Sequence, residues 1–229
     1  IDYYGFSATS VSLSNSAMVV QTNGVHIGPG HPSPGVASTT LAATDFQLVS
    51  TTALGFNGYG LLSSNTGPAT VTVTNGEVKT VGGLDAGGNS AIAIFAEVIG
   101  PSAGNALAQV NGTRVSTTGL NAFGIVALTG NGGGAGTGGA RIEARGITLS
   151  TAGANAAGLV AGGMNGNTGP VDIIFSSGTV ETQGSAAGAV VAITQGGPVT
   201  VDIQAAAQAT ANGVGSNGVA AFGPASANV

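Results

Sequence analysis

The sequence predicts an all-β protein, a right-handed parallel β-helix (β-solenoid) with three strands per coil and about six coils. The first observation behind this prediction is a repeat of about thirty residues that runs from Thr51 to the C-terminal end. Two phrases recur in it, apolar-x-Thr-x-Gly and Asn-x-x-Gly-apolar. The fourth residues of the second phrase and its variants are separated by 32, 32, 34, 30 and 30 residues: Gly60, Ile92, Gly124, Gly158, Gly188 and Gly218. A near-constant period of this length is typical of a solenoid.

The second observation is that apolar and polar residues alternate within each repeat, which is the two-residue period of a β-strand. The unit that begins at Val71 predicts three strands in order, over 71–76, 77–82 and 91–96. Helices are disfavoured because 42 of the 229 residues are glycine and no segment has the helical spacing of apolar residues. Coils stacked about 4.8 Å apart satisfy the repeat and the backbone hydrogen bonds, and parallel connections are right-handed as a rule.

The domain organisation follows from the period. Residues 1–40 fit it poorly and contain three prolines, so we expect an N-terminal cap or an irregular first coil there. The β-helix itself is predicted over 41–229, in the units 41–70, 71–106, 107–139, 140–170, 171–198 and 199–229. The units differ in length mostly after the third strand, so the variable loops gather on one edge, where repeat proteins usually place functional loops.

The repeated threonines are predicted to point into the solenoid. In Val-x-Thr the two named residues share one face of a strand, and the residue between them is Lys79 or Glu181 in two of the units. Charged side chains do not point into a dry interior, so the threonines do, and we expect their hydroxyls to bond the adjacent turn. The expected ladder is Thr51, Thr80, Thr117, Thr151, Thr182 and Thr210. An outward threonine array, which ice binding would need, requires a register shifted by one residue.

The repeated asparagines are predicted to occupy turn positions with positive φ, which Asn tolerates better than other residues with side chains. These are Asn57, Asn89, Asn121 and Asn155. A sugar-binding row of asparagine side chains is the alternative to this structural role.

Composition limits the classes of function. Only 6% of the residues are charged, four are Lys or Arg, and the net charge is −5, which argues against nucleic acid as a partner. The absence of cysteine excludes disulfides and thiolate metal sites. No apolar run approaches the roughly twenty residues that span a bilayer, so no transmembrane segment is predicted.

Candidate catalytic residues are few. Asp172 and Asp202 each follow a strand-starting valine, and the repeat predicts that they face outward on adjacent coils about 5 Å apart, a separation also found in retaining glycosidases. Arg141 occupies the equivalent position one coil earlier, so an exposed row of ion pairs explains the same residues. His26 and His31 lack a nearby carboxylate cluster. We therefore expect no enzyme, metal or cofactor, with a polysaccharide-active enzyme at Asp172 and Asp202 as the alternative.

Two phrases carry a resemblance to a known family: Gly146–Ala161 (GITLSTAGANAAGLVA) and Pro170–Gly184 (PVDIIFSSGTVETQG). They resemble the passenger region of bacterial autotransporters of the pertactin-like group, over roughly residues 41–229. The resemblance implies a secreted β-helix on the bacterial cell surface that acts as a stalk or adhesin.

The sequence thus predicts an extracellular structural or adhesive solenoid. Val219–Phe222 are followed by no polar, charged or helical cap, and exposed strand edges template further pairing, so either the chain continues or this end stacks on another molecule. The expected partners are other copies of the chain, stacked end to end into a fibre, or a surface glycan or protein. A glycan-binding module and an ice-binding protein are the alternative functions.

Overall fold

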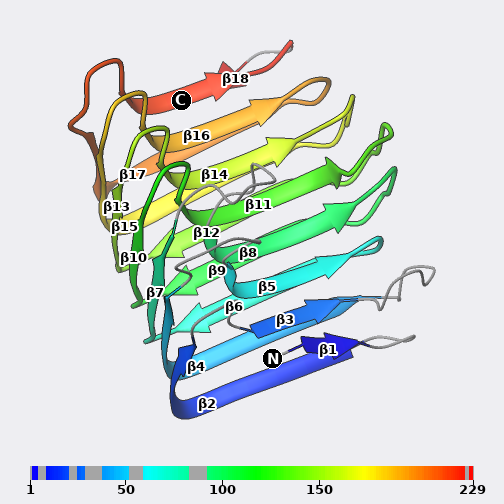
Figure 1. Ribbon diagram of the computed structural model, residues 1–229. Coiled ribbons are helices and arrows are strands. Elements are labelled where there is room, and N and C mark those ends of the chain that lie inside the picture. The colour runs from blue at the N-terminus through cyan, green and yellow to red at the C-terminus, as the bar shows by residue number, and fades with distance from the viewer. Residues whose placement is uncertain are drawn as a thin grey trace.

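A computed structural model of the chain shows an all-β solenoid of about six turns, in which parallel strands stack along one axis (Figure 1). The structure describes residues 2–4, 9–20, 25–28, 38–51, 59–82, 92–224 and 227–228. These residues contain no helix, and so none that is long and apolar enough to cross a membrane. The predicted fold class, a parallel β-solenoid, is confirmed.

The strands follow one another along the chain as β1 (Asp2–Tyr4), β2 (Thr9–Val20), β3 (Val25–Gly28), β4 (Thr39–Thr51), β5 (Tyr59–Asn65), β6 (Ala69–Thr74), β7 (Glu77–Val81), β8 (Ile92–Ile99), β9 (Ala106–Asn111), β10 (Arg114–Thr118), β11 (Phe123–Asn131), β12 (Ala140–Arg145), β13 (Ile147–Ala152), β14 (Ala157–Gly163), β15 (Val171–Gln183), β16 (Gly188–Thr194), β17 (Val199–Ala211), β18 (Asn217–Phe222) and β19 (Ala227–Asn228).

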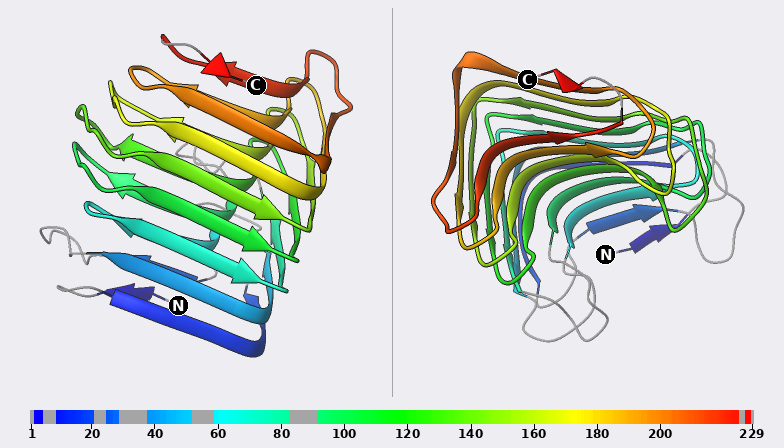
Figure 2. Two further views of the ribbon diagram at one scale, coloured as in Figure 1. Left: turned by 180° about the vertical axis from the view of Figure 1, so that it is seen from behind. Right: turned by 90° about the horizontal axis from the view of Figure 1, so that it is seen from above.

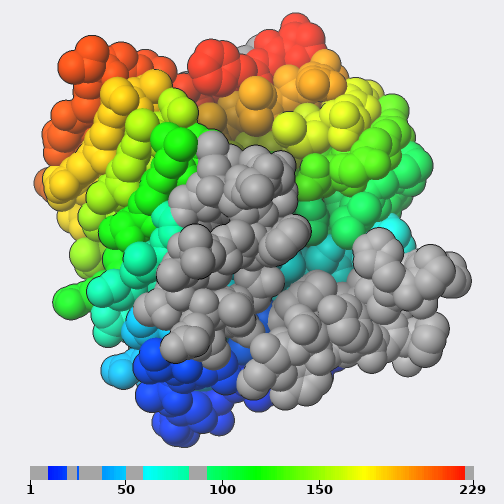
Figure 3. Space-filling view, in the orientation of Figure 1, coloured from blue at the N-terminus to red at the C-terminus, as the bar shows by residue number. Residues whose placement is uncertain are grey.

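These strands form two sheets, and the chain passes through three faces in each coil. Face 1 is a sheet made of β1, β3, β5, β8, β11, β14, β16 and β18. The second sheet contains the other strands, and β4 shows how it is divided: its first half pairs with β6 and its second half with β7. We call the part with β6, β9 and β12 face 2, and the part with β7, β10 and β13 face 3. Viewed down the axis, successive coils superimpose as nested outlines (Figure 2). In the space-filling view they follow one another as bands from β2 to β18 (Figure 3).

The first coil already follows the register of the later ones. Strand β2 pairs with β4 from Thr9 opposite Thr39 to Val20 opposite Ser50, and β3 pairs with β5. The described residues of the 1–40 stretch therefore include a full bent strand of the solenoid. The prolines of this stretch, Pro29, Pro32 and Pro34, lie outside the described residues.

The interior consists of ladders of apolar residues, because strands of adjacent coils pair residue by residue. In β6 the alternation is direct: Ala69, Val71 and Val73 are buried, and the threonines between them lie on the outside. Face 2 of the following coils begins at Ala106, Ala140, Val171 and Val199, all of which lie in the same inward ladder as Ala69. The narrow interior suits Ala and Val, and it accommodates few rings such as those of Phe46 and Phe175.

The corners between faces are built from residues with left-handed backbone. Asn121 and Asn155 have φ of 53° and 55°, as predicted, while Asn57 and Asn89 lie outside the described residues. The next coil has Ala186 in this position with φ of 53°. A glycine stands two residues before each of these positions. A Cβ on Gly153, which precedes Asn155, would lie 2.0 Å from the Gly119 carbonyl oxygen, so a larger residue does not fit there.

The threonine ladder is inward-facing over four coils. Thr80, Thr117, Thr151 and Thr182 are paired in register and no more than 1% exposed. Thr51 and Thr210 do not belong to it, because Ser50 stands opposite Thr80 and Ala211 stands opposite Thr182. In β17 the cause is a register irregularity after Ile203, which adds one residue before this position.

The prediction that the ladder hydroxyls bond the adjacent turn is wrong. The Oγ1 atoms of the four inward threonines have no hydrogen-bond partner in the structure. The ladder is thus held by methyl packing and strand pairing, with its hydroxyls buried and unpaired.

Candidate functional site

The outer side of face 2 brings polar and charged side chains together in rows that run along the solenoid axis. The first row is Thr70, Leu107, Arg141, Asp172 and Thr200; the middle row is Thr72, Gln109, Glu143, Ile174 and Asp202; the third row is Thr74, Asn111 and Arg145. Each row repeats at the strand spacing of about 4.8 Å, and neighbouring rows are two residues apart along each strand.

Asp172 and Asp202 both lie on this face, but the expected close pair is not formed. Asp172 stands opposite Thr200, and Asp202 stands opposite Ile174. The two carboxylates belong to different rows, and strand geometry puts their Cα atoms about 8 Å apart. The prediction aligned the two Val-Asp-Ile phrases, whereas the register aligns the Gly-Pro-Val phrases that begin at Gly169 and Gly197. The predicted equivalence of Arg141 and Asp172 is confirmed.

Glu143 is held by two donors. Its Oε1 accepts a hydrogen bond from Arg141 Nε at 2.7 Å, and its Oε2 accepts one from Gln109 Nε2 on the preceding coil at 2.8 Å. The Gln109 hydrogen bond lowers the pKa of Glu143, and Arg141 lowers it as well, while partial burial acts in the opposite direction. Each oxygen of the carboxylate is therefore bound to a neighbouring side chain.

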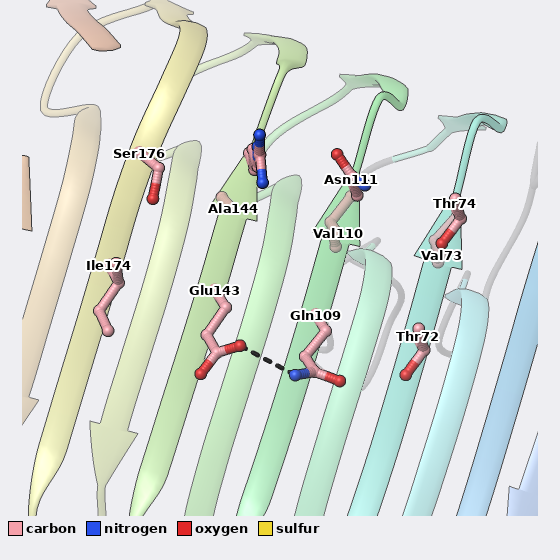
Figure 4. Close-up of a pocket in the computed structure, with 11 residues that line it drawn as sticks. Thr72, Val73, Thr74, Gln109, Val110, Asn111, Glu143, Ala144, Ile174 and Ser176 are labelled. Atoms are coloured by element: carbon pink, nitrogen blue, oxygen red, sulfur yellow. Dashed lines mark hydrogen bonds between the residues drawn. The ribbon is translucent and has the colours of Figure 1, made fainter. Parts of the chain in front are cut away.

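An open groove of about 330 Å³ lies between the middle and third rows, across β6, β9, β12 and β15 (Figure 4). Thr72, Gln109, Glu143 and Ile174 form one wall, and Thr74, Asn111 and Ser176 lie on the other. Arg145 also lines the groove and stands opposite Asn111 in the strand register, so it belongs to the second wall. The floor is made by the strand segments at Val73, Val110 and Ala144. The groove therefore exposes hydroxyl, amide, carboxylate and guanidinium groups along its length.

A second hollow of about 270 Å³ lies at the start of the same strands, beside the first row. Leu107, Arg141, Asp172, Asn105 and Pro170 line it. Asp172 is half-buried, stands opposite Arg141 in the strand register and has no carboxylate partner in its row, so the separation of about 5 Å that a retaining glycosidase needs is not found at this hollow.

Glu97 forms a polar site on the outer side of face 1 that the sequence reasoning missed. Its Oε2 accepts a hydrogen bond from Ser64 Oγ at 2.9 Å, and its Oε1 accepts one from Asn131 Nδ2 at 2.5 Å. Burial raises the pKa of Glu97, and the two hydrogen bonds oppose this shift. The available signal was a single acidic residue inside the apolar run Ile92–Ile99.

A regular grid of hydroxyls was also missed. On the first three coils, the outer side of face 2 presents three by three positions in register, of which all but the central Ala42 carry a hydroxyl. We call it the hydroxyl grid: Ser10, Ser12, Ser14, Thr40, Thr44, Thr70, Thr72 and Thr74. The pattern Ser-x-Ser-x-Ser, Thr-x-Ala-x-Thr, Thr-x-Thr-x-Thr was visible in the sequence, but at a different phase from the threonine ladder.

Metal-binding clusters are not found in the part of the chain that the structure describes, where no three His, Asp or Glu side chains gather. His26 lies in β3, opposite Asp2 and Leu62 in the strand register. His31 lies outside the described residues.

Comparison of the chain with known protein families, with curated proteins and with solved structures finds no match.

Proposed function

We propose that the chain is an extracellular structural solenoid and that copies of it stack end to end into a fibre through the edges of their coils. The observation that carries this proposal is the half-exposed interior at both ends of the stack. At one end, Ile203, Ala209 and Val219 belong to interior ladders but are only partly buried. Among the described strands, only β19 pairs with the outer edge of β17, and only at Val199 and Thr200.

The other end of the stack is similar. In β2 the interior ladders end at Val11, Leu13 and Met18, which are partly buried against the core. Both ends thus expose apolar side chains together with strand edges, and such edges pair with further strands.

The two ends also match each other. Strand β2 has 12 residues and β17 has 13, and both bend from face 2 to face 3. Continuing the register from β17 to a β2 strand of a second copy places Val11 over Val201, Leu13 over Ile203 and Met18 over Ala209. This contact joins unlike surfaces and repeats by translation along the axis, so it builds an open filament.

Low charge, a surface of small polar residues and the resemblance to autotransporter passenger regions support a secreted location on a bacterial surface. The alternative of a retaining glycosidase has less support, because Asp172 and Asp202 lie in different rows and do not form the close pair.

The proposal is tested by light scattering and negative-stain electron microscopy of the purified chain. We expect rods well beyond the about 30 Å that six coils span. Ala209→Lys places a charge in an interior ladder at the edge and should give single rods, whereas Gln208→Lys, which points outward from the same strand, should still assemble. A monodisperse monomer at all concentrations, or filaments formed equally well by Ala209→Lys, would overturn the proposal.

The hydroxyl grid favours ice binding as a second candidate function, because a flat lattice of hydroxyls can order water at regular spacings. Thermal hysteresis measured at millimolar protein tests it. Thr70→Tyr should abolish any hysteresis by breaking the flat grid, and Thr148→Tyr on the outer side of face 3 should not. Absence of hysteresis in the unsubstituted chain removes this candidate.

A further inference from the structure

We propose that the groove between the middle and third rows of face 2 binds a linear glycan that carries carboxylates, with the glycan chain lying along the solenoid axis and Arg145 binding a carboxylate. The groove lies on the side of the coils, away from the edges that end-to-end stacking would use. This inference is therefore independent of the proposed function.

The shape of the groove fits an extended polymer. It crosses four coils, which is a length of about 14 Å at the strand spacing. Its walls repeat once per coil, and the repeats offer pairs of side chains: Thr72 with Thr74 and Gln109 with Asn111 (Figure 4). The next coil offers Glu143 with Arg145. A polymer lying along the axis would meet hydrogen-bonding side chains on both sides at three of the four coils, and Ile174 with Ser176 at the fourth.

The charge of the groove fits an anion because Arg145 is left without a partner. Glu143, two residues away on the same strand, is already bound through Oε1 to Arg141 and through Oε2 to Gln109. The described residues show no ion pair or hydrogen bond for the Arg145 side chain, which is exposed at the groove wall. Arg114 stands opposite Glu77 in the strand register and Arg141 is bound to Glu143, whereas Arg145 stands opposite Asn111. Arg145 is therefore the cation of the groove lining that is open to an anion.

The spacing of the walls favours a glycan over a peptide. An extended peptide repeats every two residues at about 6.6–6.8 Å, out of step with walls that repeat at about 4.8 Å. A sugar ring is about as long as the strand spacing, so successive sugars can occupy equivalent positions on successive coils. The floor strands are already hydrogen-bonded on both edges, so a peptide could not add to the sheet here. The amides of Gln109 and Asn111 and the hydroxyls of Thr72, Thr74 and Ser176 suit sugar hydroxyls.

Calorimetric titration of the complete 229-residue chain with oligogalacturonate tests the proposal, with cellohexaose as the neutral sugar and hexaglutamate as the acidic peptide. We expect binding of oligogalacturonate that weakens with added salt, and weaker binding of the other two probes. Arg145→Gln should weaken oligogalacturonate binding roughly tenfold or more, as expected for loss of a charged hydrogen bond. Glu143→Gln should strengthen it, because a nearby negative charge is removed.

Lys79→Gln is the matched control, since it removes one positive charge from the exposed outer side of face 3 and should leave the affinity unchanged. The proposal is overturned if oligogalacturonate does not bind, if Arg145→Gln binds as tightly as the unsubstituted chain, if Glu143→Gln weakens binding, or if hexaglutamate binds at least as tightly as the uronate.

Discussion

Thr117 and Thr151 stand directly opposite each other inside the solenoid, and neither hydroxyl has a hydrogen-bond partner. A buried, unpaired hydroxyl costs stability, whereas a methyl group of the same size does not. We therefore expect Thr151→Val to raise the free energy of unfolding by about 1 kcal/mol, measured by urea denaturation.

Thr148→Val, on the exposed side of the same strand, is the control and should change stability by less than about 0.5 kcal/mol. A clear loss of stability in Thr151→Val would show instead that the ladder hydroxyls make favourable hydrogen bonds.

Gly138 lies at the corner between faces 1 and 2, where a Cβ would stand 1.8 Å from the Gly104 carbonyl oxygen of the coil before. Because this neighbour is backbone, Gly138→Ala forces the two coils apart, and we expect a loss of about 3 kcal/mol. Gly218→Ala is the matched substitution, since its nearest contact would be an ordinary 3.7 Å. Equal melting temperatures for the two variants would contradict the tight corner.

The buried carboxyl of Glu97 predicts a pH dependence. Burial raises the pKa of Glu97 above its ordinary value, so its contribution to stability is present below the unfolded-state pKa and is lost as the pH rises through the pKa of the folded state. Glu97→Gln should remove this loss, and the variant should gain most over the unsubstituted chain at neutral pH.

Glu143→Gln should change the pH dependence of stability in the opposite direction. The lowered pKa of Glu143 contributes stability above the unfolded pKa, and this is lost as the pH falls through the folded value. Thermal melts of both variants from pH 4 to pH 8 separate the two effects. A gain for Glu97→Gln that is the same at every pH would rule out its ionisation as the cause.

Phe175 is a large ring in the narrow interior and is fully buried beside the register irregularity of β15 and β17. Phe175→Ala should cost about 3–5 kcal/mol, because it removes the ring and leaves a cavity. Phe222 is 53% exposed, so Phe222→Ala should cost far less. Denaturant midpoints of the two variants measure their stabilities. Similar losses of stability in both would argue against a tightly packed interior at Phe175.

The sequence predicted the fold and the inward threonines because both depend on the repeat period and on alternation, which are properties of single strands. Thr80, Thr117, Thr151 and Thr182 each follow an inward Val or Leu by two residues, so their side was determined locally.

The arrangement of the outer face could not be predicted in the same way. Which residues stand side by side depends on register between coils, and a similar phrase at Asp172 and Asp202 pointed to the wrong alignment. The binding of Glu143 to Gln109 depends on this register and on side-chain conformation, and neither is encoded in a short motif. The unpaired threonine hydroxyls likewise follow from packing in the interior.

The register that coils share has a consequence for how such a protein can evolve. Each coil from β12 onward begins a new set of inward positions at its own Ala140, Val171 or Val199, and on face 2 each inward apolar residue stands opposite an apolar residue of the coil before. Duplicating one coil would lengthen the molecule by a fixed step without creating a new kind of interior contact. The length of the molecule can thus change by whole coils, while the residues of its outer rows can change one at a time.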